Sequence, residues 1–238
     1  MTTEPTPDEI AALLQVEHLL DQRWPETRIE PSTVRIAALM ELLGNPQLTY
    51  PCIHIAGTNG KTSVARMVDA LLTAFSRRTG RTTSPHLQSA VERIAIDGKP
   101  ISPAVYVDTY REIEPFVELV DAQSEADGGP RLSKFEVVTA MAFAAFADAP
   151  VDVGVIEVGL GGRWDATNVV DAPVVVITPI GLDHADYLGT DLAAIAAFHR
   201  WTWIGQAGIQ VLLFFVVATV VRRSLRQLGA EPDEDFVR

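Results

Sequence analysis

The sequence predicts an α/β fold, a mostly parallel sheet with helices flanking both of its faces. Short apolar segments at 52–56, 151–159 and 173–181 are typical of buried strands, and segments with helical periodicity lie between them. In addition, the first strand runs through a glycine turn into a helix, which is how a nucleotide-binding βα unit begins. Alternation of this kind favours parallel strands joined by helical crossovers.

The other elements follow from periodicity, caps and turn residues. Two helices are expected near the N-terminus within residues 9–44, one over 9–22 and one over 32–44 that is capped by Ser32 or Thr33. A capping box, Ser133 to Glu136, should open a third apolar helix. This third helix is expected over 137–147. The remaining predictions are helices at 63–75 and 105–120 (bent at Pro115), a strand that ends at Ser84, a hairpin at 91–102 and a loop at 121–131.

Composition excludes several classes of protein. The chain has 238 residues, and its 47% hydrophobic and 21% charged residues are ordinary for a globular protein with a sizeable core. A net charge of -12 argues against nucleic acid as the main partner, because phosphate neutralisation requires clustered Lys and Arg. Cys52 is the single cysteine, so no internal disulfide forms and a reducing, cytoplasmic location is expected. The N-terminal residues do not resemble a signal peptide.

One apolar segment stands apart from this globular pattern. Residues 201–221 begin with two tryptophans and are followed by two arginines, a length and flank chemistry that fit a marginal membrane span. The favoured interpretation is a buried helix or strand, so membrane contact is an alternative only.

The segment HIAGTNGKTSVARMV has the features of a phosphate-binding loop. A Walker motif would have glycine where Ile55 stands, so the motif is incomplete. Gly57 and Gly60 nevertheless allow the backbone to turn, and the amides at the following helix N-terminus can face an anion. Lys61 can reach the outer phosphates of a nucleotide and the Thr62 hydroxyl can bind Mg²⁺, whereas the alternative is a glycine turn with a surface lysine.

Three more polar residues follow predicted strands, where parallel sheets bind ligands: Ser84, Glu157 and His184. Glu157 could merely pair with Arg163, and His184 could cap the next helix or act as a general base. However, a carboxylate at the end of an apolar strand is costly without a partner, which favours a metal ligand at Glu157.

Four motifs in order, AGTNGKTS, TSPHL followed by ERI, EVGLGGRWDATN and ITPIGLDHADYLG, resemble the dihydrofolate synthase/folylpolyglutamate synthase family of the Mur ligase superfamily. The resemblance extends from Ile36 to Ala197. It implies a P-loop-like Mur ligase central domain that binds ATP and Mg²⁺. The implied reaction is ATP-dependent: dihydropteroate or folate is phosphorylated to an acyl phosphate, which the amine of L-glutamate then attacks.

The resemblance also implies roles for individual residues. The triphosphate would be held by the loop Gly57, Thr58, Asn59, Gly60, Lys61 and Thr62. Thr62, Ser84 and Glu157 would bind one Mg²⁺ and His184 a second, so that Lys61, Glu157 and His184 form the catalytic set. The pterin or pteroate would be approached by Arg163, Trp164, Asp165 and Ala166.

The sequence departs from the family after the fourth motif. His199 stands where the family has a carbamylated lysine, and Lys134 is the last lysine of the chain. We therefore expect an ATP-binding domain at 1–197 and a divergent tail at 198–238, with the C-terminal ligase domain missing and little ligase activity. The alternatives are another Mur-type amide ligase, or a nucleotide-binding module, membrane-tethered or soluble, without catalysis. The oligomeric state is left open.

Overall fold

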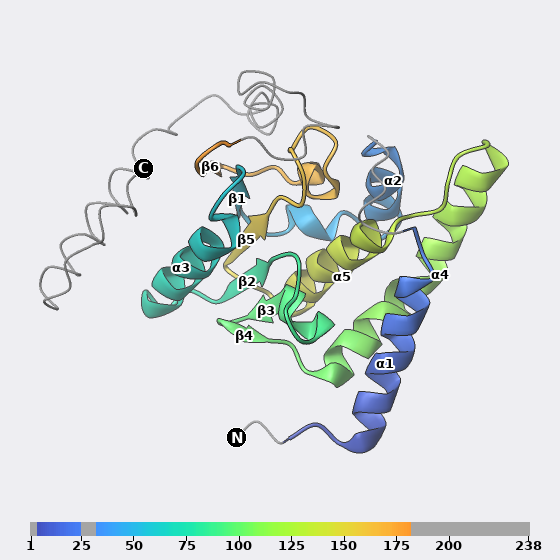
Figure 1. Cartoon of the computed structure of the whole chain (residues 1–238), viewed down its shortest axis with the longest axis horizontal. Coiled ribbons are helices and arrows are strands. Elements are labelled where there is room, and N and C mark those ends of the chain that lie inside the picture. Colours follow the sequence, from blue (N-terminus) through green and yellow to red (C-terminus); the bar gives the residue numbers. More distant parts are fainter. Residues whose placement is uncertain (1–3, 25–31, 182–238) are drawn as a thin grey trace, which may run out of the picture. The chain divides into compact units, whose positions relative to one another are not determined.

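The computed structural model describes residues 4–24 and 32–181 (Figure 1). All of them lie in one compact unit, Met1–Gln206. The predicted tail at 198–238 and its apolar segment at 201–221 lie outside the described residues. Within the described ranges, no helix combines the length and the hydropathy needed to cross a membrane.

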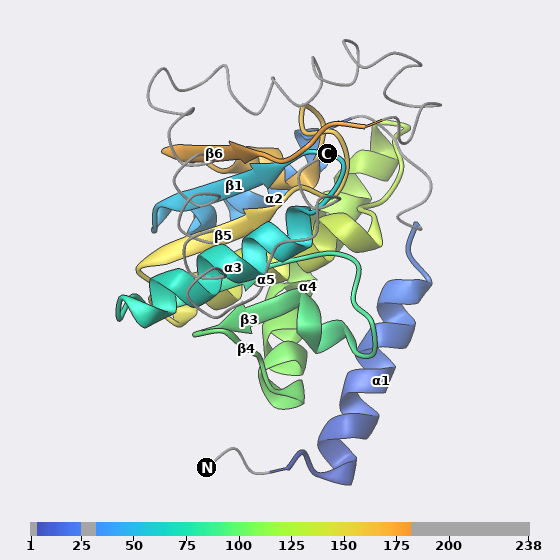
Figure 2. The same cartoon turned by 60° about the vertical axis from the view of Figure 1, so that its left-hand side comes forward.

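The described strands form a mixed sheet in the order β4-β3-β2-β5-β1-β6. Its parallel part confirms the predicted fold and comprises β1 (Cys52–Ala56), β2 (Thr79–Thr82), β5 (Val153–Glu157) and β6 (Val174–Ile177). The predicted hairpin is also present and lies antiparallel along β2, as β3 (Ile94–Ile96) and β4 (Lys99–Pro100). Figure 2 shows β6, β1 and β5 stacked in this order above the hairpin.

Helices cover both faces of the sheet, as the alternating sequence pattern predicts. One face packs against α3 (Lys61–Ala74), which follows the glycine turn. The opposite face packs against α5 (Lys134–Asp148), and the larger core continues from there into α1 (Pro7–Asp21), α2 (Val34–Leu42) and α4 (Pro103–Ala126) (Figures 1 and 2). The candidate site described below lies where the strands end beside the start of α3.

Strand β1 shows how the sequence sorts its side chains between the two layers. Successive residues of a strand point to opposite faces. Ile53 and Ile55 therefore join the small core beneath α3, whereas Cys52 joins the larger core on the α5 side. His54 has the same parity as Cys52 and is also buried. A polar side chain thus lies in the apolar layer opposite the phosphate loop.

One strand and one helix end at residues that differ from the prediction and change how the molecule is understood. Strand β2 ends at Thr82, two residues before Ser84, and helix α4 continues through Pro115 to Ala126 into the segment predicted as a loop. The polar composition of 121–131 suggested a loop, but Gln, Glu and Ala favour a helix. Burial of Asp121 among arginines also fixes this last stretch of α4 against its neighbours.

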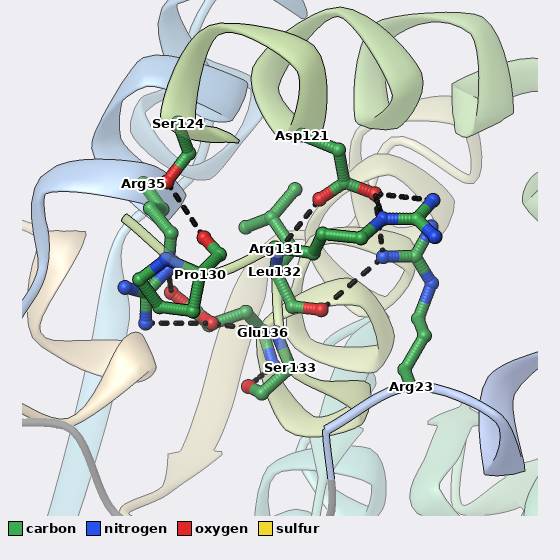
Figure 3. Close-up of polar contacts among 9 residues, drawn as sticks. All are labelled: Arg23, Arg35, Asp121, Ser124, Pro130, Arg131, Leu132, Ser133 and Glu136. Carbon is green, nitrogen blue, oxygen red and sulfur yellow. Dashed lines mark hydrogen bonds and ion pairs between the residues drawn. The ribbon is translucent and has the colours of Figure 1, made fainter. Parts of the chain in front are cut away.

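Ion pairs to two buried carboxylates, those of Asp121 and Glu136, hold the helical layer together at one end (Figure 3). The carboxylate of Asp121 accepts hydrogen bonds from the Arg23 Nη1 atom at 2.9 Å, the Arg131 Nε atom at 3.1 Å and the Leu132 amide at 2.7 Å. Nearby, Glu136 forms the predicted capping box with Ser133 and also pairs with Arg35. These contacts tie the end of α1 and the start of α2 to α4 and α5, and so fix the N-terminus of α5.

Candidate nucleotide and metal site

The phosphate loop joins β1 to α3 through two glycines with positive φ. Gly57 has φ +128°, and Gly60, the residue before α3, has φ +81°. A Cβ atom on Gly57 would lie 2.1 Å from the Thr178 Oγ1 atom and 2.7 Å from the Thr178 carbonyl oxygen. Glycine is therefore required at position 57 for two reasons, the backbone conformation and the close approach of the neighbouring strand.

The end of β6 supports this loop, a role that our sequence analysis missed. Thr178 donates to the Ala56 carbonyl through both its amide, at 2.8 Å, and its hydroxyl, at 3.2 Å. The Pro179 carbonyl accepts from the amides of Thr58, at 3.2 Å, and Asn59, at 3.1 Å. A polar residue directly after a parallel strand was the available signal, but only the pairing of β6 with β1 identifies its partner.

Lys61, the first residue of α3, lies folded over the loop. Its Nζ atom donates to the Gly57 carbonyl at 2.9 Å and to the Thr58 carbonyl at 3.5 Å. The first amides of a helix have no acceptor within the helix and carry the positive end of its dipole. The N-terminus of α3 and the Lys61 ammonium therefore make this turn favourable for an anion such as a phosphate group.

Glu157, at the end of β5, reaches the same turn from the neighbouring strand. Its Oε1 atom accepts a 2.7 Å hydrogen bond from the Thr62 hydroxyl, and its Oε2 atom accepts a 3.2 Å bond from the Ser84 amide. Residues 62, 84 and 157 come from three separate elements, and all three were predicted as metal ligands. Glu157 therefore pairs with Thr62 and Ser84, and not with Arg163, which the sequence offered as an alternative partner.

Burial raises the pKa of the Glu157 carboxyl, although its hydrogen bonds to Thr62 and Ser84 and the nearby charges of Lys61 and Arg81 oppose this effect. Such a carboxylate gains from a cation that replaces its lost hydration. Its neighbours also offer hydroxyl groups, and oxygen ligands are those that Mg²⁺ prefers. Within residues 4–24 and 32–181, no group of three or more His, Cys, Asp and Glu side chains is arranged to hold a metal. A cation at Glu157 would thus need hydroxyl, phosphate or water oxygens as well.

The glycine-rich loop after β5 holds the predicted substrate-binding residues, and they point in different directions. Trp164 is 39% exposed, and its ring lies 5.0 Å from the Arg163 guanidinium. Asp165 and Ala166 are buried instead. The Asp165 carboxylate accepts from the Leu160 amide at 2.7 Å and from the Thr167 amide at 2.9 Å. Arg163 and Trp164 are therefore the exposed members of this set, and Asp165 braces the loop beneath them.

The structure thus brings together Lys61, Thr62, Ser84 and Glu157 at the start of α3. His184 and His199 lie outside the described residues. The fold and this site define the class of the protein: an α/β domain with a glycine turn of the phosphate-loop type between its first strand and helix.

The chain is similar to known folate ligases. It is 79% identical over 195 residues to the dihydrofolate synthase/folylpolyglutamate synthase of Mycobacterium tuberculosis. The matched residues make up 81% of this chain and 40% of that protein. It is 40% identical over 169 residues to the Bacillus subtilis protein of the same name, covering 71% of this chain and 38% of the relative. The chain therefore spans less than half the length of these curated relatives. No protein-family profile matches it.

Solved structures agree with the sequence comparison. A Mycobacterium tuberculosis folylpolyglutamate synthase complexed with ADP superposes with a TM-score of 0.78 at 68% identity, over 90% of this chain and 49% of that one. The E. coli FolC protein in complex with DHPP and ADP superposes with a TM-score of 0.71 at 34% identity, over 83% of this chain and 45% of that one. By this homology, the chain belongs to the dihydrofolate synthase/folylpolyglutamate synthase family.

Proposed function

We propose that this chain binds Mg-ATP and is the nucleotide-binding part of a ligase that adds L-glutamate to dihydropteroate or folate through an acyl phosphate. The observation that supports this most directly is the meeting of Thr62, Ser84 and Glu157 at the start of α3. The matched region makes up only 40% of the Mycobacterium tuberculosis relative, so we do not assign the complete reaction to this chain alone.

In this proposal the nucleotide phosphates lie at the N-terminus of α3, within the loop Gly57–Thr62. Lys61 exchanges its contact with the Gly57 carbonyl for a phosphate oxygen, which places a positive charge where charge develops during phosphoryl transfer. Thr62, Ser84 and Glu157 hold a Mg²⁺ ion, which would neutralise charge and orient the phosphates. A second Mg²⁺ is proposed at His184.

The acceptor is proposed to bind beside the glycine-rich loop, where Trp164 offers an aromatic face and Arg163 a cation. An aromatic face stacks well on a flat heterocycle, and a guanidinium pairs with a carboxylate. Asp165 and Ala166 contribute by shaping the loop backbone, since both are buried. Among the relatives, the E. coli structure that contains DHPP and ADP is consistent with an acceptor and a nucleotide bound together. A cytoplasmic location suits the free, buried Cys52.

Ligand-induced stabilisation tests nucleotide binding. Mg-ATP should raise the thermal midpoint of the full chain, because a ligand that binds only the folded state stabilises it. Lys61→Ala should abolish the rise, whereas Lys99→Ala, which removes an exposed lysine from β4, should keep it. An equal rise in the Lys61→Ala protein, or no rise in the wild type, would refute nucleotide binding at this loop.

Catalysis requires a separate measurement because the sequence has His199 where the family has a carbamylated lysine. With dihydropteroate, L-glutamate and Mg-ATP, the purified chain should release little ADP. That result would favour a second function, a nucleotide-binding module without catalysis. Sustained, glutamate-dependent ADP release would instead establish the chain as a ligase in its own right.

A further inference from the structure

His54 is a buried polar residue with no part in the nucleotide site. It lies in the middle of β1, it is 2% exposed, and its side chain is on the α5 side of the sheet. Its neighbour on the same face, Cys52, contacts the apolar core. An imidazole in this position is costly unless its ring nitrogens find partners.

The partner of His54 comes from the segment that follows β5 in the chain. Its Nε2 atom lies 2.8 Å from the Thr167 Oγ1 atom. The Thr167 hydroxyl in turn donates to the Asp165 Oδ1 atom. Because that hydroxyl hydrogen is used, Thr167 accepts from His54, so the imidazole carries its proton on Nε2. The order of donation is therefore His54 to Thr167 to Asp165.

The far end of this chain fixes the loop backbone. The second oxygen of Asp165, Oδ2, accepts from the Leu160 amide at 2.7 Å. A Cβ atom on Gly159 would lie 3.0 Å from the same oxygen and 2.5 Å from the Phe135 ring, so the loop is pressed against α5 at this point. This hydrogen bond holds residues 160 and 165 close together, and in the segment between them Arg163 and Trp164 are exposed to solvent.

We infer that His54 is a positioning residue for the loop of residues 160–165, called the acceptor loop from here on, and that it acts through Thr167 and Asp165 on the backbone that carries Arg163 and Trp164. This inference rests on the proposed function, because it assigns the loop to a ligand with a flat heterocycle and a carboxylate. His54 immediately precedes the segment that leads into the phosphate loop, yet its side chain points to the opposite face. Its loss should therefore loosen the acceptor loop and leave the nucleotide loop unchanged.

Two substitutions of His54 separate positioning from simple filling of the core. The amide nitrogen of Gln reaches about as far as Nε2 of histidine, whereas that of Asn reaches only about as far as Nδ1. His54→Gln can therefore still donate to Thr167, and His54→Asn cannot. Cys52→Ala is the matched control, since it changes the same face of the same strand without touching Thr167.

Hydrogen exchange of the full chain is the deciding measurement because it needs no ligand. His54→Asn should speed exchange of the amides of Leu160 and Thr167 about tenfold relative to the amides of β5, as expected for loss of a buried hydrogen bond. His54→Gln should restore most of the protection, and Cys52→Ala should leave these amides as protected as in the wild type. Equal exchange in the wild type and His54→Asn, or equal loss of protection in Cys52→Ala, would overturn the inference.

Binding measurements then link the loop to its ligand. His54→Asn should weaken binding of dihydropteroate about tenfold, with Mg-ATP binding unchanged and with recovery in His54→Gln. Weakened binding of both ligands to the same degree would contradict a role confined to the acceptor loop. If the wild type binds no dihydropteroate while the exchange pattern holds, the proposed substrate fails and the positioning role of His54 stands.

Discussion

The carboxylate of Glu157 accepts a 2.7 Å hydrogen bond from the hydroxyl of Thr62, although 95 residues separate the two in the sequence. Thr62 lies in the first turn of α3 and Glu157 ends β5, so the contact joins the phosphate loop to the neighbouring strand. Glu157 is only 3% exposed. Glu157 is therefore a buried carboxylate next to a predicted phosphate site, and substituting it tests whether the protein binds magnesium there.

Glu157→Gln should remove the magnesium dependence of nucleotide binding. The glutamine side-chain oxygen can still accept from Thr62, so the fold should persist, but it lacks the charge that attracts a cation. We expect Mg²⁺ to strengthen ATP binding at least tenfold in the wild type and less than about threefold in the variant, measured by calorimetry with Mg²⁺ and with EDTA. Glu118→Gln, an exposed change on α4, is the control. Retention of the full magnesium effect in Glu157→Gln would contradict metal binding at this residue.

Gly57→Ala should distort the phosphate loop, whereas Gly44→Ala, just after the end of α2, should leave that loop intact. Both glycines have positive φ, +128° and +78°, a conformation that costs about 1–3 kcal/mol for a residue with a Cβ. Only at Gly57 would the added methyl overlap Thr178, whereas nothing lies within 4 Å at Gly44. The Mg-ATP thermal shift should disappear in Gly57→Ala and persist in Gly44→Ala. Similar shifts in both variants would show that the contact with Thr178 is unimportant for the loop.

Removing one partner of the buried ion pair between Asp69 and Arg81 should lower the free energy of unfolding more than removing both partners. It joins α3 to β2 with an Nε–Oδ2 distance of 2.8 Å, and both residues are at most 6% exposed. Arg81→Leu or Asp69→Leu alone leaves an uncompensated buried charge, with an expected loss of about 3–5 kcal/mol in the free energy of unfolding.

The double replacement of Asp69 and Arg81 by leucine should recover most of that loss, since both charges are then absent. Urea unfolding of the wild type, the two single variants and the double variant gives the coupling energy between the two positions. Strictly additive losses would show that the two side chains do not act as a pair.

The pH dependence of stability should change when His54 is replaced. Burial lowers the pKa of His54 to about 4, from 6.5 when it is unperturbed. The folded state therefore binds a proton less readily than the unfolded state, so its stability is complete above pH 6.5 and falls as the pH decreases towards 4. For this residue the loss is on the order of 3 kcal/mol.

His54→Gln lacks this titration, so its stability should fall less between pH 6.5 and 4 than that of the wild type, as measured by urea unfolding at each pH. Burial raises the pKa of Asp165, which acts in the opposite direction in both proteins. The difference between the two curves therefore reports on His54. Parallel curves would mean that the His54 imidazole takes up its proton as readily in the folded protein as in the unfolded chain.

Local patterns predicted most of the elements. The strand at 52–56 and the capping box from Ser133 to Glu136 are found as predicted, because each depends on residues that are adjacent in the sequence. The end of α4 was not predicted, since Asp121 is fixed by Arg23 and Arg131 rather than by its sequence neighbours. The domain boundary at 197 and the roles of His184 remain predictions.

By itself the sequence determined the fold class, the phosphate loop and the set of polar residues at the strand ends. These depend on periodicity, on glycines where the backbone must turn, and on motifs of a few residues. Only the tertiary structure decided which polar groups meet. The adjacency of β1, β5 and β6 brings Thr62 to Glu157, Thr178 to Gly57 and His54 to Thr167. Such contacts depend on strand order and register, which no local pattern specifies, because the partners lie about a hundred residues apart.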